Sequence, residues 1–95
     1  DNLGTIYAVH NTRGILVNWN EKRVQLANTQ DPIQIRFAYT GKVKRQHNRP
    51  SETMKKIWQE LGVPPWQRNR VPLIFYGETL QSAVGFFRVF QNLEK

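Results

Sequence analysis

Residues 61–78 read LGVPPWQRNRVPLIFYGE and lie between a helical pattern and a strand pattern. Gly62 is placed to end the helix as a left-handed cap residue. Pro64 and Pro65 prevent the helix from resuming, because proline lacks the backbone N–H and fixes φ. A plain connector would need only a glycine and a turn. Trp66 and the two arginines that follow it therefore require a separate explanation.

An amphipathic helix is predicted over 51–61, with Ser51 as its N-cap. Its apolar stripe at helical spacing consists of Met54, Ile57, Trp58 and Leu61. The opposite face carries Glu52, Lys55, Lys56, Gln59 and Glu60. Glu52 and Lys56 form an i,i+4 pair in the favourable order. A second, short helical turn is expected near 64–69.

Seven short strands are predicted from apolar alternation and from β-branched and aromatic runs. They cover 5–9, 14–19, 22–27, 33–39, 72–76, 79–84 and 86–91. The polar, basic segment 40–50 is interpreted as a loop or a loosely held hairpin arm. The pattern favours an α+β fold: one compact domain of mostly antiparallel strands, sandwich- or barrel-like. Periodicity leaves the strand order open.

Net charge is the most informative property of the composition. The 95 residues carry a formal charge of +7. Residues 36–70 contain nine Lys and Arg against two acids, so this window alone accounts for the whole excess. Clustered basic residues are typical of proteins that bind phosphates or acidic lipids, although a solvated face has the same composition.

Composition also argues against several classes of protein. The chain has no cysteine, which excludes disulfides and thiolate metal sites and is compatible with a cytoplasmic location. No apolar run reaches the roughly 20 residues of a membrane helix. His10 and His47 stand alone, and we expect neither a metal nor a catalytic site. Since the single methionine is Met54, we expect residues 1–95 to be one domain cut from a longer enzyme.

One family shows the same pattern over residues 49–88. The matching features are a basic helix, Gly-Val-Pro-Pro-Trp, an arginine pair, Pro-Leu, an acidic turn and an Ala-x-Gly strand. In this chain they are Lys55, Lys56, Gly62 to Trp66, Arg68, Arg70, Pro72, Leu73, Glu78 and Ala83 to Gly85. This pattern resembles the C-terminal domain of bacterial tRNA(Ile)-lysidine synthetases.

The resemblance implies a tRNA-binding accessory domain that grips the acceptor stem. The whole enzyme uses ATP, with magnesium, to attach lysine to the wobble cytidine of CAU-anticodon tRNA(Ile). The resemblance also implies a fold similar to a domain of the phenylalanyl-tRNA synthetase β subunit. Chemistry belongs to an N-terminal catalytic domain, which is an expected partner in the same chain. Its Ser-Gly-Gly-x-Asp-Ser loop does not occur here, so we expect no cofactor and no catalysis in this domain.

Seven cations are the candidate tRNA-binding residues, since a duplex is held through its phosphates and 2′-hydroxyls. They are Lys44, Arg45, Arg49, Lys55, Lys56, Arg68 and Arg70. The structural turn is assigned to Gly62, Pro64, Pro65 and Trp66, with Trp66 packing as the anchor. Two alternatives stay open at this point. Trp66 could stack on a base, and the two arginines after it could bind the turn's own carbonyls.

A second function from another class is also compatible with the sequence. The domain could dock on the rest of its own enzyme and gate it, without touching RNA. Exposed apolar edge strands would then carry the contacts in place of cations. A third possibility is a general binder of double-stranded nucleic acid, which would not prefer tRNA over DNA.

Overall fold

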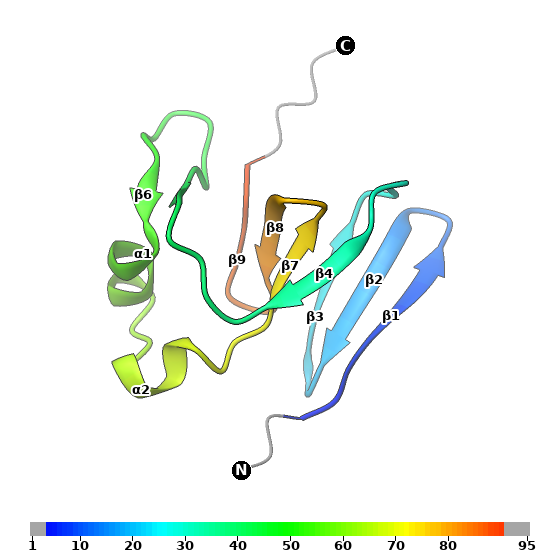
Figure 1. Cartoon of the computed structure of the whole chain (residues 1–95), viewed down its shortest axis with the longest axis horizontal. Coiled ribbons are helices and arrows are strands. Elements are labelled where there is room, and N and C mark those ends of the chain that lie inside the picture. Colours follow the sequence, from blue (N-terminus) through cyan, green and yellow to red (C-terminus); the bar gives the residue numbers. More distant parts are fainter. Residues whose placement is uncertain (1–3, 91–95) are drawn as a thin grey trace.

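Two larger antiparallel sheets, a two-stranded sheet and a small helical region make up the described part of the protein (Figure 1). The computed structural model describes residues 4–90. The first sheet has the order β1-β2-β3, with β1 at Ile6–Asn11, β2 at Gly14–Trp19 and β3 at Lys22–Leu26. Tight turns connect these strands, as the sequence pattern predicts. The α+β fold class is confirmed.

The second sheet has the order β4-β7-β8-β9 and so pairs strands that are far apart in the sequence. Its strands are β4 Ile33–Arg36, β7 Leu73–Tyr76, β8 Thr79–Ala83 and β9 Phe87–Arg88. Because β4 pairs directly with β7, the chain between them forms an excursion from the sheet. The predicted strand 86–91 ends earlier, and its last residue, Gln91, lies outside the described residues.

Two further strands raise the number in the described chain from the expected seven to nine. They are β5, Lys42–Val43, and β6, Glu52–Thr53, which pair antiparallel. The segment 40–50 is therefore a hairpin arm, one of the two interpretations that the sequence allows. The arm carries four of the basic residues of the window 36–70, namely Lys42, Lys44, Arg45 and Arg49. It leads directly into the predicted helix.

The second sheet is covered on both faces, and β7 explains how. Ile74 and Tyr76 belong to the cluster that packs against the first sheet. Leu73 and Phe75, on the opposite face of the strand, belong to the cluster that includes the helix. A strand buried on both faces needs apolar residues at every position, which is why LIFY does not alternate. All four residues of β7 are buried.

The helix starts later than the sequence pattern predicts. Helix α1 is Met54–Glu60, and its N-cap is Thr53, whose Oγ1 accepts a hydrogen bond from the Lys56 backbone N–H at 3.3 Å. Ser51 is exposed and precedes β6, so its assignment as N-cap is wrong. Glu52 is buried in β6 instead of lying on the solvent face of the helix. Strand pairing with Val43 competes with the helix for this residue.

The end of α1 agrees with the prediction. Gly62 has φ +74°, a conformation that glycine adopts without the strain a side chain would cause. Leu61, expected on the buried stripe, is 39% exposed because it is already the cap residue and lies beyond the helix.

The turn after α1 contains helix α2, Pro65–Arg68, in agreement with the expected helical turn. Trp66 does not anchor this turn, because its side chain is 73% exposed and α2 buries none of its residues. The buried residues Val63 and Val71 fix the two ends of the turn instead. The interpretation of Trp66 as a core residue is therefore wrong, since a helix of four residues has no second turn to direct the indole inward.

Candidate nucleic-acid interface

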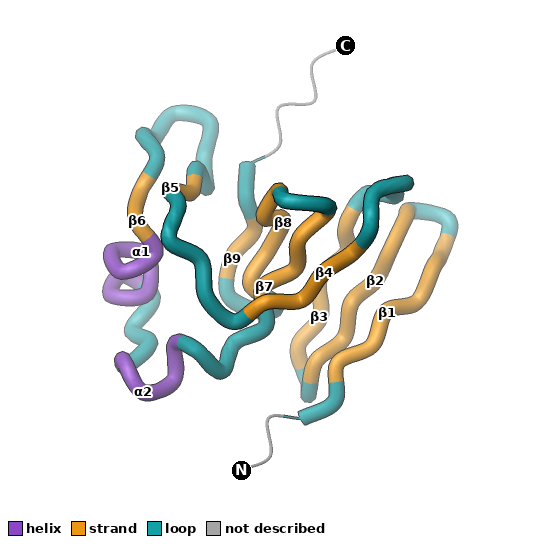
Figure 2. The backbone as a smooth tube through the Cα atoms, in the orientation of Figure 1, coloured by secondary structure: helices purple, strands orange, loops and turns teal. Residues whose placement is uncertain are grey.

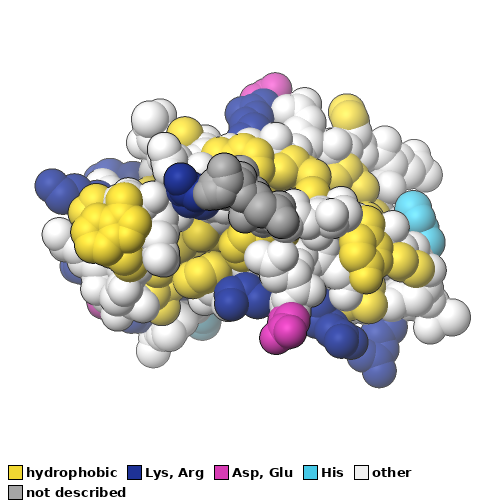
Figure 3. Space-filling model, turned by 90° about the horizontal axis from the view of Figure 1, so that it is seen from below, with side chains coloured by type: hydrophobic (Ala, Val, Ile, Leu, Met, Phe, Trp, Pro, Cys, Tyr) yellow, Lys and Arg dark blue, Asp and Glu magenta, His cyan; other side chains and the backbone are white. Residues whose placement is uncertain are grey.

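The elements that carry the basic window lie together at one end of the molecule. Strands β5 and β6 and helices α1 and α2 form this end, away from the sheet β1-β2-β3 (Figure 2). Residues 42–70, which contain these elements, hold eight Lys and Arg against two acids, so six of the seven net positive charges lie in this part of the chain. Arg36, also in the basic window, lies on β4. The face seen in Figure 3 carries Lys and Arg side chains at both ends, and at this end they lie beside an exposed hydrophobic side chain.

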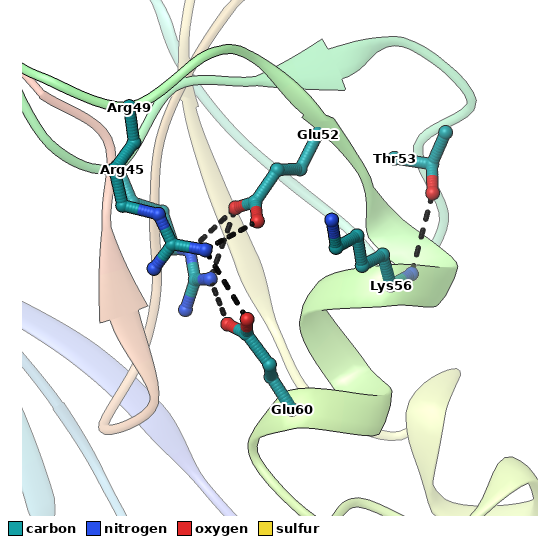
Figure 4. Close-up of polar contacts among 6 residues, drawn as sticks. All are labelled: Arg45, Arg49, Glu52, Thr53, Lys56 and Glu60. Atoms are coloured by element: carbon teal, nitrogen blue, oxygen red, sulfur yellow. Dashed lines mark hydrogen bonds and ion pairs between the residues drawn. The ribbon is translucent and has the colours of Figure 1, made fainter.

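Two of the seven candidate cations form a compact ion-pair network with two acids (Figure 4). The Arg45 guanidinium donates to Glu52 Oε1 from Nε at 3.1 Å and from Nη2 at 2.9 Å, and it also binds Glu60. Arg49 Nη2 donates to Glu52 Oε2 at 3.0 Å and to Glu60 Oε2 at 3.2 Å. Each carboxylate thus binds both arginines. The Glu52 side chain is only 5% exposed and that of Arg45 13%.

The network shifts the pKa of Arg45 and of Glu60. Burial by itself would lower the pKa of Arg45, but hydrogen bonds from its guanidinium to Glu60 and Glu52 outweigh this and raise it. The pKa of Glu60 is lowered, first by the hydrogen bond from Arg45 and then by that from Arg49. Both shifts favour the charged forms of Arg45 and Glu60.

This network binds the hairpin arm to the helix. Arg45 and Arg49 lie on the loop between β5 and β6, whereas Glu60 is the last residue of α1. Sequence reasoning missed this role for the two acids. A signal was available, because Glu52 and Glu60 are the two acids within the otherwise basic window 36–70. Glu60 lies 11 and 15 positions from the two arginines, which hid its pairing, whereas Glu52 was assigned to the solvent face of the helix.

The lysine candidates are placed differently from these arginines. Lys55 and Lys56 are exposed on the outer side of α1, as predicted. Lys44 is half-buried, and its backbone carbonyl accepts a hydrogen bond from the Phe90 N–H at 2.7 Å. Lys42 and Lys44 also line a cavity of about 240 Å³ between β5 and β8. The lysines thus lie on α1 and along the hairpin arm.

The two remaining candidates follow the Pro-Pro-Trp sequence. Arg68 Nε donates to the Val63 carbonyl at 2.8 Å, so this arginine binds the turn's own backbone. This is one of the alternatives that the sequence left open for the arginine pair. Arg70 is exposed, and its backbone N–H donates to the Gln67 carbonyl at 3.0 Å. Contact of either residue with RNA stays a prediction.

Apolar side chains are exposed on the edge strands at the other end. Strand β1 is an edge of the first sheet, with Tyr7 58% and Val9 48% exposed. Strand β4 is an edge of the second sheet, with Ile33 40% and Ile35 43% exposed. Phe37, which follows β4, is also exposed. The apolar face of the predicted strand 33–39 is therefore largely open to solvent.

Two further kinds of site do not occur among residues 4–90. No group of three or more His, Asp or Glu side chains there is arranged to hold a metal ion. Among the same residues, no helix has the length and apolar character needed to cross a membrane.

Comparison with known proteins identifies relatives over nearly the whole chain. Residues 33–94 match the family described as "TilS substrate C-terminal domain". A tRNA(Ile)-lysidine synthase from Haemophilus influenzae strain PittGG is 58% identical over 97% of this chain. Proteins of the same name from Histophilus somni strain 129Pt and Shewanella woodyi are 50% and 46% identical, over 96% and 77% of the chain.

The chain spans only about a fifth of the length of these relatives: 21% of the Haemophilus and Histophilus proteins and 16% of the Shewanella protein. The family match covers well over half of the chain, and it includes the helix, the Pro-Pro-Trp turn and the second sheet. The chain belongs to the family of the C-terminal domain of tRNA(Ile)-lysidine synthases.

Proposed function

We propose that this chain is the tRNA-binding accessory domain of a cytoplasmic tRNA(Ile)-lysidine synthase and that it holds the acceptor stem of CAU-anticodon tRNA(Ile). The observation that carries this proposal is the excess of positive charge in residues 42–70, which hold eight Lys and Arg against two acids and contain β5, β6, α1 and α2. A field of one sign at one end of a small domain attracts a polyanion and orients it.

The candidate cations divide into two roles in this proposal. Lys55 and Lys56, exposed on a rigid helix, and Arg70, exposed after α2, contact the phosphates directly. Lys44 contributes from the hairpin arm. Arg45, Arg49 and Arg68 are positioning residues, because their guanidinium groups bind Glu52, Glu60 and the Val63 carbonyl.

Duplex RNA is the class of ligand that this arrangement fits. The major groove of an RNA duplex is too narrow for side chains, so recognition relies on shape and on backbone contacts. Such recognition needs cations whose supports do not move. Helix α1 provides such a support, because Met54, Ile57 and Trp58 are buried beneath its two exposed lysines. ATP and lysine would be bound by the rest of the synthase, where the resemblance places the chemistry.

The test is binding of this chain to three RNAs over a salt series: the whole tRNA, its acceptor-stem minihelix and its anticodon stem-loop. We expect equal, salt-sensitive binding of the tRNA and the minihelix and weak binding of the stem-loop. The double substitution Lys55→Ala with Lys56→Ala should reduce the slope of log K against log salt by about 1 per lysine. A DNA duplex of the minihelix sequence measures the preference for RNA.

The matched control removes the same charge elsewhere. Arg13 and Arg23 are exposed on the first sheet, and the double substitution Arg13→Ala with Arg23→Ala also lowers the net charge by two. Equal loss of binding in both double variants would show that only net charge matters and would contradict a local interface. Failure of the unsubstituted chain to bind any RNA at about 0.15 M salt would contradict the proposal as a whole.

A second function is favoured by one observation, the exposed apolar side chains on the edge strands β1 and β4. In this function the chain docks on the catalytic portion of its synthase and does not contact RNA. Polar substitutions Val9→Ser and Ile35→Ser would then weaken association with that portion, whereas charge reversal by Lys55→Glu and Lys56→Glu, at exposed positions of α1, would leave it intact. If the polar substitutions leave the association intact and the charge reversals weaken it, the RNA interface is favoured.

A further inference from the structure

Trp66 is the most exposed of the large hydrophobic side chains in the described part of the chain. Its exposed fraction is 73%, compared with 4% for Trp58 in the same region. A large aromatic side chain gains free energy when it leaves water, so an indole held in solvent is an unfavourable arrangement for the free protein. Tryptophan is enriched at surfaces that bind a partner, because its ring is apolar and its N–H is polar.

The backbone below Trp66 is held firmly. Pro64 and Pro65 restrict φ at two successive positions. The Gln67 N–H donates to the Pro64 carbonyl at 2.9 Å, and Arg68 Nε donates to the Val63 carbonyl at 2.8 Å. On both sides the turn joins the core, through Val63 and Val71, which are 4% and 3% exposed. The indole is therefore presented on a preorganised support, which reduces the entropy lost on binding.

The surroundings of Trp66 are basic. Arg68 and Arg70 follow within four residues, and the helix that precedes the turn carries exposed Lys55 and Lys56. No acid occurs between Glu60 and Glu78 in the sequence. An exposed aromatic side chain among cations is the arrangement with which proteins bind single-stranded nucleic acid: the ring stacks on a base while the cations bind the phosphates.

We propose that Trp66 is a stacking platform for an unpaired nucleotide that extends from an RNA duplex held by the neighbouring cations. The inference rests on the proposed RNA-binding function. It adds a single-stranded segment to the duplex as a second part of the ligand. A base inside a duplex has both of its faces covered by neighbouring bases, whereas an unpaired base offers a free face. The ligand is therefore a duplex with a single-stranded extension, and Trp66 determines the preference for the extension.

The experiment compares three RNA hairpins with identical stems: one blunt, one with a four-nucleotide 3′ extension and one with a four-nucleotide 5′ extension. Binding is measured by fluorescence anisotropy at about 0.15 M salt. We expect one of the extended hairpins to bind about tenfold more tightly than the blunt one, within the range that stacking of one base on an aromatic side chain provides. Whichever extension gives the gain identifies the strand end that reaches Trp66.

Three variants assign this preference to the indole. Trp66→Ala should abolish the difference between extended and blunt hairpins and leave blunt binding unchanged. Trp66→Phe should keep most of the difference, because phenylalanine retains a π-face. Leu61→Ala is the matched control: it removes another exposed apolar side chain near the same turn, but one without a π-face, and should keep the full difference. Because Trp66 is so exposed, the thermal midpoint should not change in Trp66→Ala.

A second readout is the quenching of tryptophan emission by the extended hairpin, which should disappear in Trp66→Phe. The stacking platform is contradicted if the unsubstituted chain binds all three hairpins equally, or if Trp66→Ala weakens blunt and extended binding by the same factor. In both cases the RNA-binding function itself would stand. Absence of binding to every hairpin would instead contradict the RNA-binding function, and the stacking platform with it.

Discussion

Arg68 shows how one side chain can have a structural role within a basic surface. Its Nε hydrogen bond to the Val63 carbonyl closes the turn that contains both prolines. The sequence places Arg68 and Arg70 in one cationic pair, but the structure gives Arg68 a structural contact of its own. Substitution of Arg68 therefore changes stability as well as charge.

Arg68→Ala should lower the free energy of unfolding by about 1 kcal/mol, the typical net value of one hydrogen bond. Thermal and urea denaturation measure this change. Arg68→Lys retains the charge but loses the planar guanidinium donor, and we expect it to be destabilised to a similar extent. If Arg68→Lys were as stable as the unsubstituted chain, the hydrogen bond to Val63 would be irrelevant to stability.

Glu60 makes stability depend on pH in the acid range. Its pKa is lowered in the folded chain by hydrogen bonds from Arg45 and Arg49. A lowered pKa means that the folded state binds the proton less tightly than the unfolded state. The contribution of Glu60 to the free energy of unfolding is thus fully present above its ordinary pKa of 4.5. It is lost as the pH falls through the lower pKa of the folded chain.

Glu60→Gln should consequently be less stable than the unsubstituted chain at pH 7, and the difference should shrink as the pH falls below 4.5. Urea denaturation at a series of pH values measures this convergence. Glu21→Gln, at an exposed position between β2 and β3, is the control for the loss of one negative charge. A constant difference between Glu60→Gln and the unsubstituted chain at all pH values would contradict the coupling.

At the scale of elements, competition between strand pairing and helix capping decides where α1 begins. Both Ser51 and Thr53 are residues that cap helices well. Local sequence therefore cannot choose between them. The choice follows from β6, which withdraws Glu52 and Thr53 from the helix by pairing them with β5 and places the Glu52 carboxylate between two arginines.

Thr53→Ala should destabilise the chain by about 1 kcal/mol, because the Lys56 N–H in the first turn loses its acceptor. Ser51→Ala, two residues earlier, should change stability by less than about 0.5 kcal/mol, as is usual for exposed sites. Chemical denaturation of the two variants, measured side by side, tests the position of the N-cap. The reverse order of effects would restore Ser51 as the cap.

At the scale of the whole molecule, the second sheet is the central layer. Its face toward the first sheet packs in a cluster with Ile15, Val17 and Val24, and its other face packs against α1 through Phe75. This arrangement fixes the basic end relative to the two sheets. Loss of packing between the sheets should therefore affect the stability of the whole domain.

Ile15→Ala should lower the free energy of unfolding by about 3 kcal/mol, because Ile15 is 1% exposed between the two sheets. That is a large fraction of the 5–15 kcal/mol that stabilises a typical domain. Val9→Ala, on the paired strand β1, should cost far less because Val9 is 48% exposed. Denaturation midpoints of the two variants measure the difference. Equal effects would contradict the assignment of the inter-sheet core.

The sequence by itself determined most of the elements. Alternation together with runs of β-branched and aromatic residues predicted seven of the nine strands of the described chain, and helical spacing with Gly62 predicted the end of α1. These signals depend on residues that are near neighbours along the chain. Net charge placed the candidate interface in residues 36–70 for the same reason, since the excess lies in one continuous window. The family pattern in the Pro-Pro-Trp region could also be recognised from the sequence alone.

The tertiary structure alone decided what depends on residues far apart in the sequence. Pairing of β4 with β7 joins Ile33 to Tyr76, and no local pattern encodes that partner. Glu60 meets Arg45 across 15 positions, and only folding of the hairpin arm brings the two charges together. Trp66 is exposed because Val63 and Val71 already fix the turn to the core. Burial is a property of the packed chain, so an aromatic residue in a turn does not reveal its environment from sequence.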